Sequence, residues 1–195
     1  MLPGSCPCRH GPLLGGGSDR AVFLDRDGVL IEDTGYPDDP DRLALLPGVG
    51  EALRRFAADH RRLVVVTNQS GVARGFFSLE RLDACHDRLR ELLAAEGVRL
   101  DGIYYCPHHP AAAVPEFALL CDHRKPGPGM LLSAARELGL DLTRCWIIGD
   151  REGDIQAGLA AGVPGIRIRT ADACEETAAR AVASNLFAAA CWLLR

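Results

Sequence analysis

Four short polar segments of this 195-residue chain carry residue types that suit phosphate and metal chemistry. In the first, Asp25 and Asp27 follow the apolar run 21–24 and lie two residues apart, so extended backbone would point both carboxylates to the same side. Two carboxylates this close repel each other, and a hard cation such as Mg²⁺ would relieve that repulsion. One aspartate could then act as a nucleophile and the other as a general acid and base, whereas an ordinary Asp-x-Asp-Gly turn is the alternative.

The other three segments offer hydrogen-bond donors, positive charge and further carboxylates. Thr67 and Asn68 end a second apolar run and could donate hydrogen bonds to a phosphate. Lys125 could neutralise a phosphate, and the neighbouring Arg124 could bind one through two parallel hydrogen bonds. Asp150 ends another buried run and is a candidate ligand for Mg²⁺. Taken singly, these segments could also be a polar turn, a solvated basic pair and a helix N-cap.

Two Cys-x-His segments lie just before the basic pair. Cys106 and His108 are followed, after 12 intervening residues, by Cys121 and His123. Two close pairs of nitrogen and sulfur ligands fit tetrahedral Zn²⁺, and four protein ligands predict a closed, structural site. His109 is an alternative to His108, and buried cysteines with surface histidines would be the explanation without a metal.

Apolar runs alternate with helical patterns along the chain, and this alternation would position the polar segments. Predicted strands span 21–24, 63–66, 102–105, 145–148 and 165–168, and predicted helices begin near residues 49, 79, 129 and 152. Such alternation predicts an α/β fold with a doubly wound, mostly parallel sheet covered on both faces. Because ligands bind at the carboxyl ends of parallel strands, we expect the polar segments to converge there.

Together, the four segments resemble, in order and spacing, the four motifs of the haloacid dehalogenase superfamily of phosphohydrolases. The resemblance extends over residues 21–169 and implies a Rossmann-like fold. It implies that Asp25 attacks phosphorus to form an aspartyl-phosphate and that Asp27 is the general acid and base. By the same resemblance, Mg²⁺ would be held by the Asp25 carboxylate, the Asp27 backbone carbonyl and Asp150. The transferring phosphoryl group would be held by Thr67, Asn68 and Lys125.

The segments at 104–110 (YYCPHHP) and 121–126 (CDHRKP) are similar to one branch of that superfamily, which contains heptose-bisphosphate and histidinol phosphatases. This resemblance implies Mg²⁺-dependent removal of the 7-phosphate from D-glycero-D-manno-heptose 1,7-bisphosphate, a small phosphorylated sugar. Histidinol-phosphate phosphatase is the alternative activity, because it uses the same catalytic residues. The branch also implies structural zinc, held by Cys106, His108, Cys121 and His123. It often carries cysteine at the last of these positions, but histidine is also a good zinc ligand.

The same branch implies where a sugar bisphosphate would bind. The resemblance implies substrate contacts at Asp33, Thr34, Gly35, Tyr36, Gln69, Ser70, Arg124 and Arg151. Arg124 could hold the phosphate that is not cleaved. The 40 residues from Asp27 to Thr67 leave no room for a large cap domain, so we expect a minimal cap and an open pocket.

Two functions of other classes would leave different traces in the sequence. A zinc-stabilised, non-catalytic binding module would be expected to have lost a catalytic residue. The candidates are all present, namely Asp25, Asp27, Thr67, Lys125 and Asp150. A hydrolase that used Zn²⁺ directly would need three protein ligands and an open position, and four ligands argue against it. The sequence therefore favours a Mg²⁺-dependent phosphatase.

Composition excludes several classes of partner. The net charge of −4 and the pI near 5.9 argue against nucleic acid as a partner. No apolar run approaches about 18 residues and the N-terminus shows no signal-peptide pattern, so we expect no membrane association and a cytoplasmic monomer. Eight cysteines are too sparse for a disulfide scaffold.

We expect residues 1–20 to be a flexible extension, in which Cys6, Cys8 and His10 are weak metal candidates, and residues 21–195 to form a single domain.

Overall fold

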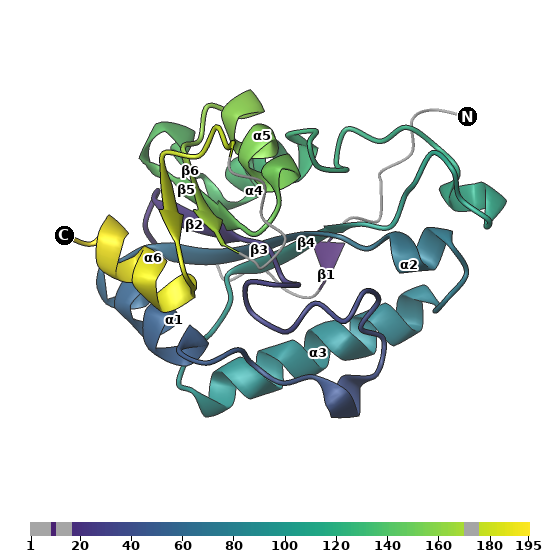
Figure 1. Cartoon of the computed structure of the whole chain (residues 1–195), viewed down its shortest axis with the longest axis horizontal. Coiled ribbons are helices and arrows are strands. Elements are labelled where there is room, and N and C mark those ends of the chain that lie inside the picture. The colour runs from purple at the N-terminus through teal and green to yellow at the C-terminus, as the bar shows by residue number, and fades with distance from the viewer. Residues whose placement is uncertain (1–8, 11–16, 170–175) are drawn as a thin grey trace.

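The computed structural model describes residues 9–10, 17–169 and 176–195. Within these residues, seven strands form one sheet in the order β1-β4-β3-β2-β5-β6-β7 (Figure 1). The strands are β1 (Arg9–His10), β2 (Ala21–Leu24), β3 (Arg62–Asn68), β4 (Gly102–Cys106), β5 (Trp146–Gly149), β6 (Gly165–Ile168) and β7 (Ala181–Ala183). Neighbouring strands are parallel except for β1, which pairs antiparallel with β4. The predicted mostly parallel sheet is therefore confirmed.

Helices cover both faces of this sheet, as the alternating pattern predicts. The helices are α1 (Val49–Ala58), α2 (Ser70–Ala73), α3 (Leu79–Ala95), α4 (Gly129–Leu138), α5 (Glu152–Ala160) and α6 (Leu186–Leu193). In Figure 1, α1 and α3 lie on one side of the sheet and α4 and α5 lie on the other, with α6 beside α1. Short 3-10 turns lie in the loops at Pro40–Arg42, Pro115–Phe117 and Leu142–Arg144.

Strand β2 shows why the strand sequences are continuously apolar. Val22 and Leu24 belong to the hydrophobic core that the sheet forms with α1, α3 and α6. Ala21 and Phe23 point to the opposite face and belong to the core that the sheet forms with α4. Because successive side chains alternate between two buried faces, every position of β2 is apolar.

Three elements carry no clear signal in the sequence, namely β1, α2 and β7. Arg9–His10 lies within the segment expected to be a flexible extension, and it pairs with Ile103 and Tyr104 at the edge of the sheet. Edge strands this short gain their order from the neighbouring strand, so no apolar run of their own is required. The metal candidates Cys6 and Cys8, and the side chain of His10, lie outside the described residues.

The chain reverses its direction of travel across the sheet at β2. From β2 it proceeds through β3 to β4 on one side, and it then returns to β5 on the other side of β2. The backbone N–H of Asp25 donates to the Ile148 carbonyl at 2.9 Å, so the ends of β2 and β5 stay together. A reversal of this kind opens a crevice at the carboxyl ends of the strands, where α/β proteins bind their ligands.

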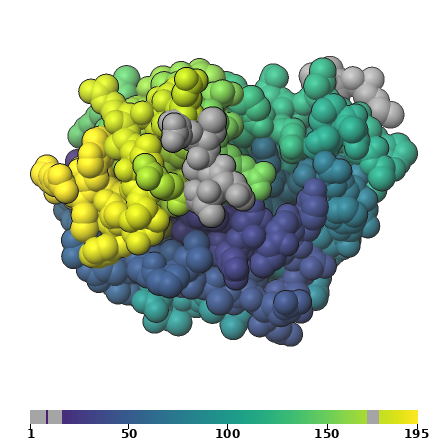
Figure 2. Space-filling view, in the orientation of Figure 1, coloured from purple at the N-terminus to yellow at the C-terminus, as the bar shows by residue number. Residues whose placement is uncertain are grey.

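The connections around this crevice are short. Residues 25–61, all of them described, hold the Pro40–Arg42 turn and α1, so the predicted minimal cap is confirmed. Figure 2 shows the C-terminal segment in yellow at one end of the molecule and the loop after β4 in teal at the opposite end. Among the helices of the described ranges, none has the length and apolar character needed to cross a bilayer.

Candidate active site

A cavity of about 380 Å³ lies at the carboxyl ends of the strands and gathers most of the predicted site residues. Its lining consists of Asp25, Asp27, Asp33, Gly35, Tyr36, Pro37, Thr67, Asn68, Gln69, Ser70, Arg124, Lys125, Arg151, Gly153 and Asp154. Residues from four separate segments of the chain therefore meet in one pocket. Thr34 is the exception among the predicted substrate contacts, because it lines a neighbouring cavity instead.

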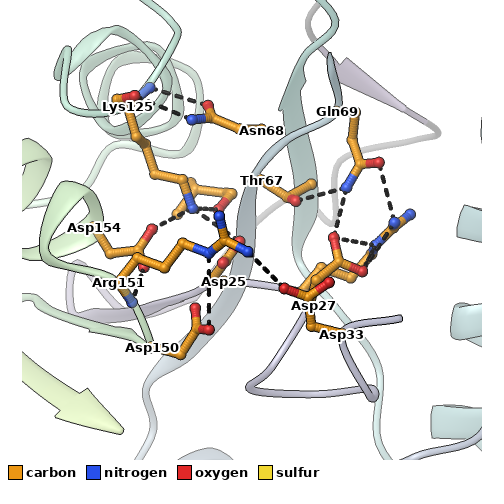
Figure 3. A network of polar contacts seen from close by, with 12 residues as sticks. Asp25, Asp27, Asp33, Thr67, Asn68, Gln69, Lys125, Asp150, Arg151 and Asp154 are labelled. Atoms are coloured by element: carbon orange, nitrogen blue, oxygen red, sulfur yellow. Dashed lines mark hydrogen bonds and ion pairs between the residues drawn. The ribbon is translucent and has the colours of Figure 1, made fainter. Parts of the chain in front are cut away.

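Lys125 lies at the centre of the pocket's charges (Figure 3). Its Nζ donates to Asp25 Oδ1 at 2.8 Å and to the Val66 carbonyl at 2.8 Å, and it forms an ion pair with Asp154 Oδ1 at 2.5 Å. Burial alone would lower the pKa of Lys125, but the carboxylates of Asp154 and Asp25 outweigh it and raise that pKa. Lys125 is therefore a fixed positive charge whose three N–H donors all have partners.

Three buried carboxylates surround this ammonium group. The side-chain oxygens of Asp25, Asp150 and Asp154 lie within 4.8 Å of one another. Burial, together with the charges of Asp25 and Asp154, raises the pKa of Asp150 to about 7. Asp150 Oδ1 is buried and has no hydrogen-bond partner. The three carboxyl groups outnumber the Lys125 ammonium, and the exposed Arg151 lies beside them with its Nε 4.0 Å from Asp150 Oδ2. This cluster of oxygen donors fits a divalent cation such as Mg²⁺.

A glycine protects this cluster from crowding. Gly28 follows the Asp-x-Asp segment with φ of +78°, a conformation that favours glycine. A Cβ atom built on it would lie 2.6 Å from Asp150 Oδ2, closer than any side chain allows. The turn after β2 therefore needs glycine both for its backbone and for the close approach of Asp150.

Asp27 points away from the carboxylate cluster. Arg26, which is fully buried, donates from Nε to Asp27 Oδ1 at 3.1 Å, and Gln69 Nε2 donates to Asp27 Oδ2 at 2.8 Å. Burial raises the pKa of Asp27, and the Arg26 charge partly opposes that rise. A carboxyl that faces the pocket with a raised pKa suits proton transfer.

Asn68 and Thr67 have different partners, although they are adjacent in sequence. Asn68 Nδ2 donates to the Lys125 carbonyl at 3.0 Å, and Asn68 Oδ1 accepts from the Lys125 backbone N–H at 3.0 Å. This reciprocal pair joins the end of β3 to the Lys125 loop, so Asn68 positions Lys125. The Thr67 hydroxyl accepts a hydrogen bond from Gln69 Nε2 at 2.8 Å.

The mouth of the pocket carries two arginines and an aromatic ring. Arg151, whose side chain is 72% exposed, pairs through Nη2 with Asp33 Oδ2 at 2.7 Å. The Tyr36 ring packs edge-on against Phe76 with 4.7 Å between ring centroids. Arg124 Nη1 donates to the His108 carbonyl at 3.2 Å, which ties the pocket wall to the Cys/His loop.

The Cys/His loop brings together three of the four predicted zinc ligands. Ligand atoms of Cys106, His108 and Cys121 lie within 4.8 Å of one another. Burial and the neighbouring Cys121 raise the pKa of Cys106 to about 12, and burial lowers the pKa of His108, which favours the neutral imidazole that binds metals. His123 is not part of this group, and its Nε2 lies 3.1 Å from Ser133 Oγ.

The sequence analysis overlooked Arg26. This residue stands between Asp25 and Asp27 directly after β2. The alternation that turns both aspartates toward the pocket would turn the intervening side chain into the protein, where a cation needs a carboxylate partner. The Asp-Arg-Asp order after a fully buried strand was the signal that could have identified the Arg26–Asp27 pair.

Known proteins are similar to this chain in sequence. A family described as "HAD-hyrolase-like" matches residues 123–189. The D-glycero-beta-D-manno-heptose-1,7-bisphosphate 7-phosphatase of Rhodopseudomonas palustris is 41% identical over 152 residues, which are 78% of this chain and 84% of that protein. The protein of the same name from Escherichia coli K12 is 47% identical over 143 residues, which are 73% of this chain and 75% of that protein.

A solved structure supports the same relationship. The D,D-heptose 1,7-bisphosphate phosphatase from B. bronchiseptica, complexed with magnesium and phosphate, matches with a TM-score of 0.76 and 34% identity. The match covers 90% of this chain and 98% of that one. The chain therefore belongs to the haloacid dehalogenase superfamily, in the family of the heptose-1,7-bisphosphate 7-phosphatases, and is a phosphoric monoester hydrolase.

Proposed function

We propose that this enzyme is a Mg²⁺-dependent phosphatase that removes the 7-phosphate of D-glycero-β-D-manno-heptose 1,7-bisphosphate. The observation that carries the proposal is the 41–47% identity to relatives named for that reaction, over most of their length. The β anomer is proposed because both names specify it. The cavity of about 380 Å³ supports a ligand the size of a phosphorylated sugar.

Asp25 is proposed as the nucleophile, with Asp27 as the proton donor and acceptor. An Asp25 carboxylate oxygen attacks phosphorus, the bond between phosphorus and the sugar's 7-oxygen breaks, and Asp27 gives its proton to that oxygen. Asp27 then takes a proton from water as the water attacks the aspartyl-phosphate, which releases inorganic phosphate and restores Asp25. The support is the geometry, since Lys125 holds Asp25 while separate partners hold Asp27.

Positive charge and donors would stabilise the phosphoryl group during transfer. Mg²⁺ would be held by the Asp25 carboxylate, the Asp27 backbone carbonyl and Asp150, and when bound it would neutralise negative charge on the phosphoryl oxygens. Before substrate binds, the positive charge of Lys125 compensates the negative charges of Asp25 and Asp154. When substrate is bound, one N–H of the Lys125 ammonium can donate to a carboxylate and to a phosphoryl oxygen at the same time. Thr67 contributes its hydroxyl from the end of β3.

The distal part of the substrate would lie at the pocket mouth. Arg124 lines the pocket and can bind the uncleaved phosphate through its guanidinium group. Arg151, Asp33 and Tyr36 surround the same opening and are proposed to contact the sugar. Thr34 is left out of this proposal, because it lines the neighbouring cavity.

A structural Zn²⁺ is proposed in the loop after β4. Cys106, His108 and Cys121 provide three ligands of the right type, and His123 is proposed as the fourth. The contact of its Nε2 with Ser133 leaves Nδ1 as the available ligand atom. The loop is joined to the pocket because the Arg124 backbone N–H donates to the Cys121 carbonyl at 2.9 Å. Zinc would therefore hold the Arg124–Lys125 segment in place.

The experiment that tests this function measures phosphate release with Mg²⁺ from heptose 1,7-bisphosphate and from histidinol phosphate. The Asp25→Asn variant is the blank, because it keeps the shape of the site without its nucleophile. A kcat/KM at least about 10²-fold higher on the bisphosphate, lost in the blank, is the expected result. A preference for histidinol phosphate would overturn the substrate assignment and leave the phosphatase chemistry intact.

A further inference from the structure

Gln69 hydrogen-bonds to two residues that line the pocket, Asp27 and Thr67, and to the buried Arg26 behind them. It follows β3 directly and is 4% exposed. Its Nε2 donates to Asp27 Oδ2 and to Thr67 Oγ1, each at 2.8 Å, and its Oε1 accepts from Arg26 Nη2 at 3.1 Å (Figure 3 shows the first two contacts). Protein groups therefore use both of its N–H donors, and no donor remains for a substrate.

Arg26 determines which way the Gln69 amide faces. A guanidinium group can only donate hydrogen bonds, so the amide oxygen must face Arg26 and the amide nitrogen must face Asp27 and Thr67. Arg26 itself cannot turn away, because it is fully buried and forms an ion pair with Asp27 at 3.0 Å. The orientation of the amide is thus set by charge and packing rather than by solvent.

This orientation has a consequence for Thr67. Its oxygen accepts from Gln69, so the Thr67 hydroxyl proton points away from Gln69 and is available to a group bound in the pocket that Thr67 lines. A hydroxyl that has accepted a hydrogen bond is also a better donor, because bonds in such a chain polarise one another. Gln69 therefore makes Thr67 a donor to a phosphoryl oxygen rather than a competing acceptor.

We propose that Gln69, oriented by Arg26, is a positioning residue that fixes the Asp27 carboxylate and the Thr67 hydroxyl for catalysis. The inference rests on the proposed function in one respect, since it takes Asp27 to be the proton donor. It differs from the substrate contact that the family resemblance implies for Gln69. Loss of a positioning residue lowers kcat. Loss of a substrate contact that is equally strong in the ground state and the transition state raises KM and leaves kcat unchanged.

The test compares Gln69→Glu and Gln69→Met with wild type. Glutamate has the shape of glutamine but only accepts, so its contacts with Asp27 become repulsive, while methionine removes all three hydrogen bonds. We expect kcat to fall by about 10²-fold in both variants while KM changes by less than about 3-fold. Arg62→Met is the matched control, because Arg62 is a buried, paired arginine at the far end of β3 and its loss should lower stability without this change in kcat.

Two further readouts distinguish positioning from general damage to the fold. In an Asp27→Ala background, Gln69→Met should lower kcat by a much smaller factor than in wild type, because most of its effect passes through Asp27. With 4-nitrophenyl phosphate, whose leaving group needs no proton, the loss in kcat/KM should be smaller than with an alkyl phosphate.

Each outcome bears on the proposal. A raised KM with an unchanged kcat, or equal losses in the wild-type and Asp27→Ala backgrounds, would overturn it. A wild-type enzyme that prefers histidinol phosphate would overturn only the substrate assignment, since the Gln69 comparison is then made with histidinol phosphate, which is itself an alkyl phosphate. A wild-type enzyme inactive on every ester with Mg²⁺ would overturn both proposals.

Discussion

The carboxylate pocket and the Cys/His loop each bring together side chains that can hold a cation, but they are organised differently. In the pocket, Asp25, Asp150 and Asp154 are held by strand ends and a buried lysine compensates part of their charge. In the loop, Cys106, His108 and Cys121 come together beside Arg124, whose charge opposes the rise in the Cys106 pKa, and the predicted fourth ligand is not part of the cluster.

This difference separates a site that the sheet organises from a cluster that the proposed zinc would complete. The turns that carry Asp25 and Asp150 are joined by a backbone hydrogen bond between adjacent strands, so their spacing follows from strand pairing. The loop between β4 and α4 has only a 3-10 turn of regular structure. It is held by scattered backbone hydrogen bonds, such as those from Ala113 and Val114 to the Ala73 carbonyl, rather than by strand pairing. We therefore expect changes in the pocket to affect catalysis most and changes in the loop to affect folding most.

The largest effect is predicted for Lys125→Met. Loss of this charge leaves Asp25 and Asp154 facing each other and removes a donor from the phosphoryl group, so kcat/KM should fall by at least about 10³-fold. Breaking a buried ion pair also costs about 3–5 kcal/mol of stability, which urea unfolding would measure. Activity within about 10-fold of wild type would show that the pocket does not depend on this lysine.

A smaller effect on activity and a large one on stability are predicted for Cys106→Ser. This fully buried cysteine should be essential for zinc, so the variant should contain less than one tenth of the wild-type zinc by elemental analysis. Its unfolding free energy should fall by several kcal/mol. Cys85→Ser is the control, because Cys85 is equally buried in α3 far from the loop. Equal zinc content in both variants would contradict the zinc site.

Asp150→Asn should stabilise the protein in buffer without Mg²⁺ while abolishing activity. The pKa of Asp150 is raised to about 7 in the fold, so the unfolded chain loses this proton near pH 4 while the folded chain retains it. Wild-type stability should therefore fall as pH rises from about 4 to about 7, by on the order of 2–4 kcal/mol. Urea unfolding at pH 4.5 and pH 8 should show the advantage of the variant only at pH 8, and an equal difference at both would contradict the assignment.

The smallest effect is predicted for His123→Ala. If His123 becomes the fourth zinc ligand, zinc affinity should fall by about 10–100-fold, which is less than the loss in Cys106→Ser. His109→Ala is the matched control, since the sequence offers His109 as an alternative ligand and the structure leaves it outside the cluster. Competition with a chelator measures both affinities. Wild-type affinity in His123→Ala would mean that protein ligands other than His123 complete the site.

The central strands could be predicted closely from the sequence. The predicted strands 21–24 and 165–168 match β2 and β6 to the residue. β2 is a continuous apolar run, as expected for a strand buried on both faces, and β6 keeps a short, mostly apolar run that is interrupted by the buried Arg167. The position of the pocket could also be predicted, because polar residues that directly follow parallel strands meet at the same edge of the sheet. The edge strands β1 and β7 could not be predicted, because their pairing partners rather than their own residues stabilise them.

Contacts between side chains were harder to predict than positions along the chain. The Arg26–Gln69 contact joins residues 43 apart and depends on which way each side chain leaves the backbone. Thr34 is next to Asp33, yet it faces a different cavity. The sequence spacing of His123 suggested a ligand, but spacing does not determine that its Nε2 is directed at Ser133.

The central claim is that Asp25 carries the phosphoryl group, and a rapid-quench experiment tests it most directly. Enzyme with Mg²⁺ and heptose 1,7-bisphosphate would be quenched in acid within one turnover, digested and analysed by mass spectrometry. We predict that the peptide containing Asp25 gains the mass of one PO₃ group and that the Asp25→Asn variant gains none. Phosphate release within that turnover, with no modified peptide at any quench time, would contradict the account.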